Sequence, residues 1–171
     1  MVGLAGAFEG RYGQEMASHD AAGVIAPPPI LFLATWTVAL LLHRIVRLEL
    51  SRNHRAVRRV LGGALIGAGV CLSALVVRRF ADASTPVSPL RATRALVIVG
   101  PYRFSRNPDY LGQVLVYTGS AMFKNRVWPL IVLPAALALV TNGVIEREEQ
   151  YLDARFGAAY REYATRVPRW L

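Results

Sequence analysis

The sequence predicts an all-α polytopic membrane protein with about four transmembrane helices, the last two forming a hairpin, followed by a C-terminal amphipathic helix. Of its 171 residues, 54% are hydrophobic and only 18% are charged. A mean hydropathy of +0.33 is too apolar for an ordinary soluble domain. The apolar residues also gather in runs long enough to enter or cross a bilayer, with the charges between them. We therefore expect the bilayer to be the solvent of most of the chain.

The first two apolar runs are predicted to be spanning helices. The first extends from Pro28 to Val46, and His43 and Arg44 can snorkel to the interface at its end. The second extends from Val60 to Val77. Small residues allow helices to approach closely within a membrane. The second run contains four such positions, Gly62, Gly63, Gly67 and Gly69.

The next two apolar runs are predicted to form a helical hairpin. The run from Tyr110 to Phe123 has 14 residues, which at helical rise gives roughly 21 Å against a hydrocarbon core of about 30 Å. It cannot cross comfortably by itself. Residues 124–126 are polar and precede a longer apolar run from Val127 to Ile145. We expect a membrane hairpin whose polar turn snorkels.

The remaining segments complete the predicted organisation. From Glu146 to Arg166 apolar residues recur every three or four positions, which predicts an amphipathic helix. We divide the chain into an N-terminal segment (1–27), the first two transmembrane helices (28–80) and a catalytic half (81–171). Residues 1–23 include three acidic residues, which is not typical of a cleaved signal peptide.

The charge pattern favours membrane lipids over nucleic acid as the partner. Nineteen of the 20 basic residues are Arg, mostly beside apolar runs, where anionic headgroups and the positive-inside rule account for them. With four spans, both termini and the 81–107 loop share one side, which carries 12 of the 20 basic residues. One cysteine excludes a disulfide framework, and the histidines are too scattered to indicate a metal site.

The first candidate motif, GPYRFSRNPDYLG, occupies residues 100–112 at the end of a long polar loop. Asn107 is predicted to cap a helix that begins at Pro108. The N-terminus of that helix would suit an anion. The alternative is an ordinary helix start, with Arg103 and Arg106 as headgroup anchors.

The second candidate motif lies in residues 146–170, directly after the apolar hairpin. Glu148 and Glu149 belong to it, and carboxylates close to a membrane are costly enough to suggest a function. The alternative is charge balance on a solvated helix face, with Arg155 opposite Glu148 and Arg147 opposite Glu149.

Together the two motifs resemble the isoprenylcysteine carboxyl methyltransferase and phospholipid methyltransferase group, over roughly residues 85–170. The family segment G-x-Y-x-x-x-R-H-P-x-Y-x-G is matched by Gly100, Tyr102, Arg106, Asn107, Pro108, Tyr110 and Gly112. The later segment E-E-x-x-L-x-x-x-F-G-x-x-Y-x-x-Y is matched by Glu148, Glu149, Leu152, Phe156, Gly157, Tyr160 and Tyr163. The resemblance implies methyl transfer from S-adenosylmethionine to a lipophilic acceptor, whether a carboxylate, a thiol or an amine headgroup.

The resemblance also implies a site. In the family, the loop before the first motif, the motif itself and the first glutamate of the later pair enclose the cofactor, and we include the second glutamate as a candidate. Carried over, these positions are Arg94, Ala95, Leu96, Val97, Tyr102, Asn107, Pro108, Asp109, Tyr110, Glu148 and Glu149. We expect Glu148 to bond the polar end or ribose of the cofactor, and Tyr102 and Tyr110 to wall the adenosine. Arg103 or Arg106 is expected to orient an acidic acceptor, while Tyr151 and Tyr160 are expected in an interfacial belt.

Two departures from the family pattern bear on the acceptor. The motif histidine is Asn107, which cannot titrate near neutral pH and so cannot be a general base. Val144 stands where eukaryotic members carry a substrate-binding arginine, which argues against a prenylcysteine carboxylate. The rival functions are a sterol-reductase-like membrane reductase using NADPH and a non-enzymatic membrane scaffold. Because S-adenosylmethionine is cytosolic, we expect the 81–107 loop and the tail to face the cytosol.

Overall fold

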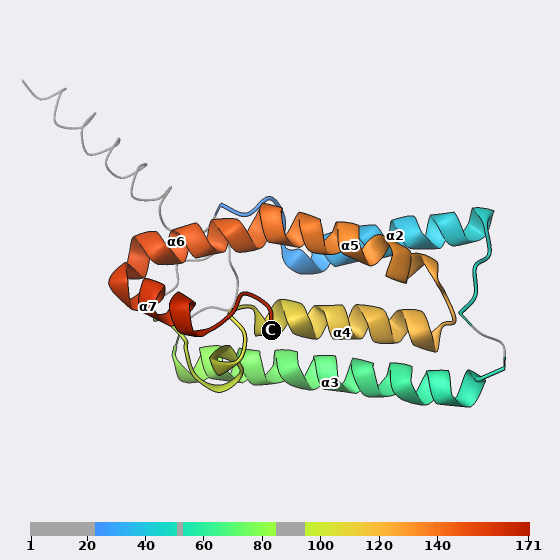
Figure 1. Cartoon of the computed structure of the whole chain (residues 1–171), viewed down its shortest axis with the longest axis horizontal. Coiled ribbons are helices and arrows are strands. Elements are labelled where there is room, and N and C mark those ends of the chain that lie inside the picture. The colour runs from blue at the N-terminus through green and yellow to red at the C-terminus, as the bar shows by residue number, and fades with distance from the viewer. Residues whose placement is uncertain (1–22, 51–52, 85–94) are drawn as a thin grey trace, which may run out of the picture.

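A computed structural model describes residues 23–50, 53–84 and 95–171 (Figure 1). The regular elements in these ranges are helices. In chain order they are α2 (Pro28–Ile45), α3 (Arg55–Asp82), the 3-10 turn η1 (Gly100–Arg103), α4 (Pro108–Phe123), α5 (Trp128–Val140), the π-helical turn η2 (Thr141–Ile145), α6 (Glu146–Phe156) and α7 (Ala158–Arg166). These ranges contain no strand, and the prediction of an all-α membrane protein is confirmed.

Within the described residues, three helices are long and apolar enough to cross a bilayer. They are Pro28–Ile45, Arg55–Asp82 and the continuous helix Trp128–Phe156. The second is longer than the predicted 60–77, because arginines, which are good helix formers, extend both of its ends. At 16 residues, α4 is shorter than the roughly 20 that a spanning helix needs, as its sequence predicted. That α4 also crosses stays a prediction.

Glycines allow α4 to pack closely along α3. A Cβ on Gly62 would lie 2.7 Å from the carbonyl oxygen of Gly119, and one on Gly69 would lie 2.5 Å from a carbonyl oxygen of α4. Neither position can accept a side chain without moving backbone. A Cβ added at Gly63 or Gly67 would meet nothing within 4 Å, so these two glycines face away from α4. Two of the four predicted close-packing glycines therefore make the contact.

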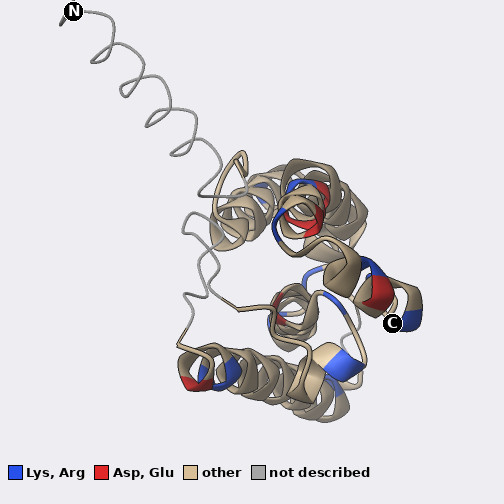
Figure 2. Ribbon diagram, turned by 90° about the vertical axis from the view of Figure 1, so that its left-hand side faces the viewer, with Lys and Arg blue, Asp and Glu red and all other residues tan. Residues whose placement is uncertain are grey.

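The helices form two packed pairs. α3 packs on α4 and α2 packs on α5, and the view along the bundle shows α4 lying between α3 and the α2–α5 pair (Figure 2). The core between α2, α4 and α5 contains Phe32, Tyr117 and Val140. A tight turn joins the antiparallel α4 and α5, as predicted, with Asn125 at a positive φ of 57°. Each helix of this hairpin nevertheless makes its most extensive contacts outside it.

The C-terminal segment differs from the single amphipathic helix predicted over Glu146–Arg166. The helix breaks at Gly157, whose φ of +53° lies in the region that glycine tolerates best, and the chain turns back as α7. At its other end, α6 continues α5 and η2 without interruption. The first turn of α6 therefore places three acidic residues, Glu146, Glu148 and Glu149, directly beyond the apolar part of a membrane helix.

Candidate active site

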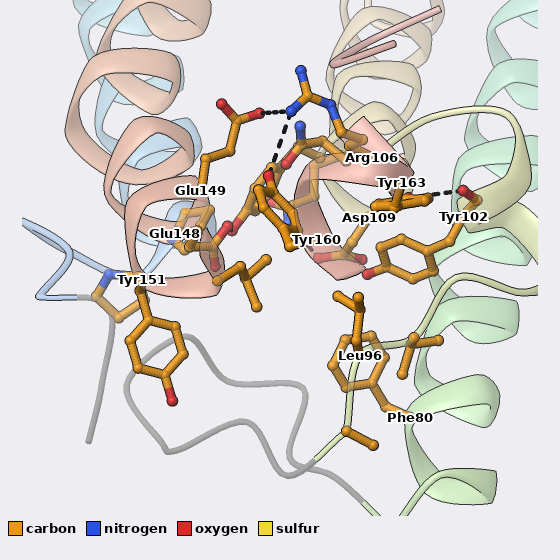
Figure 3. Close-up of a pocket in the computed structure, with 18 of the residues that line it drawn as sticks. Phe80, Leu96, Tyr102, Arg106, Asp109, Glu148, Glu149, Tyr151, Tyr160 and Tyr163 are labelled. Carbon is orange, nitrogen blue, oxygen red and sulfur yellow. Dashed lines mark hydrogen bonds and ion pairs between the residues drawn. The ribbon is translucent and has the colours of Figure 1, made fainter. Parts of the chain in front are cut away.

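A cavity of about 410 Å³ lies at this end of the bundle, between α6, α7, the start of α4 and the loop that includes η1 (Figure 3). Ten of the residues expected in the site line it: Ala95, Leu96, Val97, Tyr102, Arg106, Asn107, Asp109, Tyr110, Glu148 and Glu149. Arg94 falls outside the described residues. Arg103 is exposed and Pro108 is fully buried, and neither lines the cavity. The structure thus brings together two motifs separated by about 40 positions of sequence.

Several lining residues were not predicted from the sequence. Pro27–Pro29 and Phe80 contribute from the start of α2 and the end of α3. Gln113 also lines the cavity, and a polar residue in the apolar run 110–123 was the available signal. The interfacial belt position expected for Tyr160 is wrong, because this side chain is buried with 5% exposure and faces the cavity. Tyr151 lines the cavity as well.

Tyr110 and Glu148 form the central polar contact. Tyr110 is in the first turn of α4, and its hydroxyl donates a 2.7 Å hydrogen bond to Oε2 of Glu148 in the first turn of α6. The charge-balance alternative for Glu148 is not what the structure shows. The guanidinium of Arg155 instead lies 6.0 Å from the centre of the Tyr151 ring. Glu148 is therefore oriented at the cavity by a neutral donor rather than by an arginine.

Glu149 is held between two arginines. Its Oε1 lies 3.0 Å from Nη1 of Arg106, which also donates to the hydroxyl of Tyr160 at 3.4 Å. Arg169 donates to both carboxylate oxygens, at 3.1 Å from Nε and 2.7 Å from Nη2. The predicted partner, Arg147, instead donates to the carbonyl of Gly23 at 2.9 Å. The charge-balance alternative for Glu149 is therefore wrong, and sequence reasoning missed Arg169.

Asn107 takes the N-cap position of α4, but its side chain makes no capping bond. Its Nδ2 donates instead to the carbonyl of Arg169 at 2.9 Å, and its backbone N–H is satisfied by Oγ of Ser105 at 3.1 Å. The predicted N-cap position and the helix start at Pro108 are confirmed, but the capping hydrogen bond from the side chain is not formed. The next residue, Pro108, has no N–H to be capped. Asn107 thus ties the motif loop to the C-terminal segment.

Tyr102 forms an aromatic wall on the opposite side of the cavity from α6 (Figure 3). Its ring lies 5.8 Å from that of Phe80, and its carbonyl accepts a 2.8 Å hydrogen bond from the hydroxyl of Tyr163. Desolvation raises the pKa of the Tyr102 phenol above its usual value, and the negative charges of Glu148 and Asp109 add to the shift. The phenol is therefore neutral at physiological pH.

Two polar atoms on cavity-lining side chains are buried without a hydrogen-bond partner in the described part of the chain. They are the Nε donor of Arg106 and the Oε1 acceptor of Gln113. Buried polar groups are nearly always paired in native proteins. These two side chains therefore have unused capacity for a ligand with both acceptor and donor groups.

The family of the chain follows from its match to known sequences. The model for the phospholipid methyltransferase family matches residues 57–159, more than half of the chain. The chain belongs to this family. The matched region contains most of the residues that line the cavity, including those on η1, α4 and α6. No curated protein and no solved structure matches the chain. Family membership, together with the apolar helices, identifies the protein as an integral membrane methyltransferase.

Proposed function

We propose that the cavity binds S-adenosylmethionine and that the protein transfers its methyl group to a lipophilic acceptor at the membrane edge. The observation that carries this proposal is the charge of the lining. Three carboxylates, Asp109, Glu148 and Glu149, border the cavity. Glu149 is held by the two arginines Arg106 and Arg169, whereas Asp109 and Glu148 make no ion pair within the described residues. S-adenosylmethionine is a net cation at neutral pH, since its sulfonium and ammonium outweigh its carboxylate. An acidic cavity with one basic group complements that distribution.

The individual groups also fit this cofactor. Tyr102 and Tyr110 offer aromatic surface for the adenosine. Glu148, already oriented by Tyr110, can accept from the ribose hydroxyls or the ammonium group. The unpaired donor on Arg106 suits the methionine carboxylate, and the unpaired acceptor on Gln113 suits an amino group. A cavity of about 410 Å³ is also within the usual size for such ligands.

The cofactor, when bound, supplies a methyl group on a positively charged sulfur. Transfer of this methyl group to the acceptor nucleophile would break one carbon–sulfur bond and leave the sulfur as a neutral thioether. The protein's contribution is to align the acceptor in line with that bond and exclude water. An amine acceptor also loses a proton, for which Glu148 and Asp109 are the nearby carboxylates. Asn107 cannot perform this step.

The lining favours an amine-bearing lipid as acceptor. A carboxylate acceptor would approach the carboxyl groups of Asp109 and Glu148, which border the cavity, whereas Glu149 is already held between two arginines. Val144 is fully buried and apolar. Eukaryotic members of the isoprenylcysteine carboxyl methyltransferase group carry a substrate-binding arginine at this position, so the arginine that would hold a carboxylate acceptor is missing here. An amine is attracted by the same carboxylates and can deliver its proton to one of them.

The charge of the lining also opposes the reductase alternative. NADPH carries several phosphates, whereas Arg106 is the one basic side chain among the described lining residues. Calorimetry of detergent-purified protein with S-adenosylhomocysteine and with NADPH tests the proposal. We expect binding of the first alone. Binding of NADPH alone would support the reductase, and binding of neither would support a scaffold. A labelled-methyl transfer screen against amine lipids follows.

We further propose that the cavity faces the cytosol, where the cofactor is made. Arg103 is exposed near the cavity and Cys71 is the single cysteine. An Arg103→Cys variant in a Cys71→Ser background should therefore react with an impermeant maleimide in inverted vesicles but not in right-side-out vesicles. Labelling only in right-side-out vesicles would reverse the orientation.

A further inference from the structure

The C-terminal segment after α7 is bonded to the motif loop through its backbone. The carbonyl of Pro168 accepts a 2.9 Å hydrogen bond from the N–H of Arg106. The carbonyl of Arg169 accepts from Nδ2 of Asn107 at 2.9 Å and from Oγ of Ser105 at 3.3 Å. Three consecutive loop residues are therefore fixed by two consecutive carbonyls, which places the side chain of Arg169 beside the cavity-lining pair Arg106 and Glu149.

The side chain of Arg169 competes with Arg106 for the same carboxylate. Arg169 contacts both oxygens of Glu149, at 3.1 and 2.7 Å, whereas Arg106 reaches only Oε1, at 3.0 Å. The side chains of Arg106 and Glu149 are each 17% exposed. Arginine and carboxylate prefer a two-pronged arrangement when both oxygens are free. Because Arg169 takes that arrangement, Arg106 retains a buried Nε without a partner.

We propose that Arg169 is a positioning residue that keeps Arg106 available to the ligand. By holding both oxygens of Glu149, it prevents this carboxylate from closing a two-pronged pair with Arg106. A guanidinium N–H then remains directed at an anionic group in the cavity. This inference rests on the proposed function, in which that group is the methionine carboxylate of the cofactor.

The test compares Arg169→Ala with a matched control, Arg166→Ala. Arg166 is exposed and pairs with Glu162 at 3.3 Å on the outer face of α7. Loss of Arg169 should weaken S-adenosylhomocysteine binding about tenfold and raise KM similarly, with kcat little changed. Arg169→Lys should retain only part of the affinity that Arg169→Ala loses, because an ammonium cannot contact both oxygens of Glu149 in the same planar arrangement. The control should bind as the wild type does.

A rescue experiment separates positioning from a role in folding. If Glu149 captures Arg106 once Arg169 is gone, then removing that charge as well, in Arg169→Ala/Glu149→Gln, should restore most of the lost affinity. A merely structural contact predicts a double variant at least as weak as the single one. Thermal unfolding of the ligand-free variants supplies a measurement independent of the cofactor, and we expect both to remain folded.

The outcomes also distinguish this inference from the proposed function. Failure of the wild type to bind S-adenosylhomocysteine would reject both. Wild-type binding with unchanged affinity in Arg169→Ala, or with no rescue in the double variant, would overturn the role of Arg169 alone. Unfolding of Arg169→Ala without ligand would assign the residue to stability and overturn the positioning role.

Discussion

Replacing Tyr110 by phenylalanine should weaken cofactor binding about tenfold while leaving the helices intact. The hydroxyl of Tyr110 donates a 2.7 Å hydrogen bond to Glu148. A hydrogen bond to a charged group contributes about 1.5–3 kcal/mol, and about 1.4 kcal/mol corresponds to a factor of ten in affinity. Glu148 borders a cavity that water can enter, so part of the loss is recovered by solvation. The lower end of that range is therefore expected.

The assay is calorimetric titration with S-adenosylhomocysteine in a double-mutant cycle of Tyr110→Phe and Glu148→Gln. Since the two groups act through one hydrogen bond, their effects should be strongly non-additive. Glu162→Gln is the control, because this carboxylate is exposed and pairs with Arg166 away from the cavity. Unchanged affinity in both single variants would refute the assignment of Glu148 to the cofactor.

Three further predictions concern packing, pH and the motif loop. Gly69→Ala should destabilise the protein by about 1–3 kcal/mol in thermal unfolding, because its Cβ would meet an α4 carbonyl, whereas Gly63→Ala, in open space, should be neutral or stabilising by about 0.5–1 kcal/mol. The raised pKa of Tyr102 means that the folded protein keeps a proton that the unfolded chain loses near pH 10, so stability should be retained below about pH 10 and fall above it, less steeply in Tyr102→Phe. If the stability of Tyr102→Phe fell above pH 10 as steeply as that of the wild type, the raised pKa of Tyr102 would not be the cause. Arg103→Ala should bind S-adenosylhomocysteine as the wild type does, since Arg103 is exposed; a tenfold loss would place it at the ligand.

The sequence was sufficient to predict the membrane helices and most of the cavity lining. Apolar runs bounded by prolines or arginines determine helix ends locally, and α2 begins and ends within one residue of its prediction. The two motifs were informative because their spacing places Tyr110 and Glu148 in the first turns of two neighbouring helices. The helix ends depend on residues that are close in sequence, and the motif residues were known from the family pattern.

The side-chain partners could not be predicted, because they depend on how distant segments fold back. Charge balance suggested that Glu149 would pair with Arg147 of its own helix, but the break at Gly157 returns the chain and brings Arg169 to it. A glycine inside a periodic pattern indicated that the helix could break there, but not in which direction the chain would continue. Likewise, Gln113 was visible as a polar residue in the apolar run 110–123, but its place in the cavity depends on how α4 packs against distant segments.

The replacement of the family histidine by Asn107 is explained by what its side chain does. Nδ2 of Asn107 donates to the carbonyl of Arg169, which is part of the attachment that sets Arg169 against Glu149. An amide donates at every pH, whereas a histidine donates to a given acceptor only in one tautomer or when protonated. This position therefore supplies a constant structural donor rather than a proton-transfer group. Under the proposed function, a proton lost by an amine acceptor would therefore pass to one of the carboxylates that border the cavity, Glu148 or Asp109.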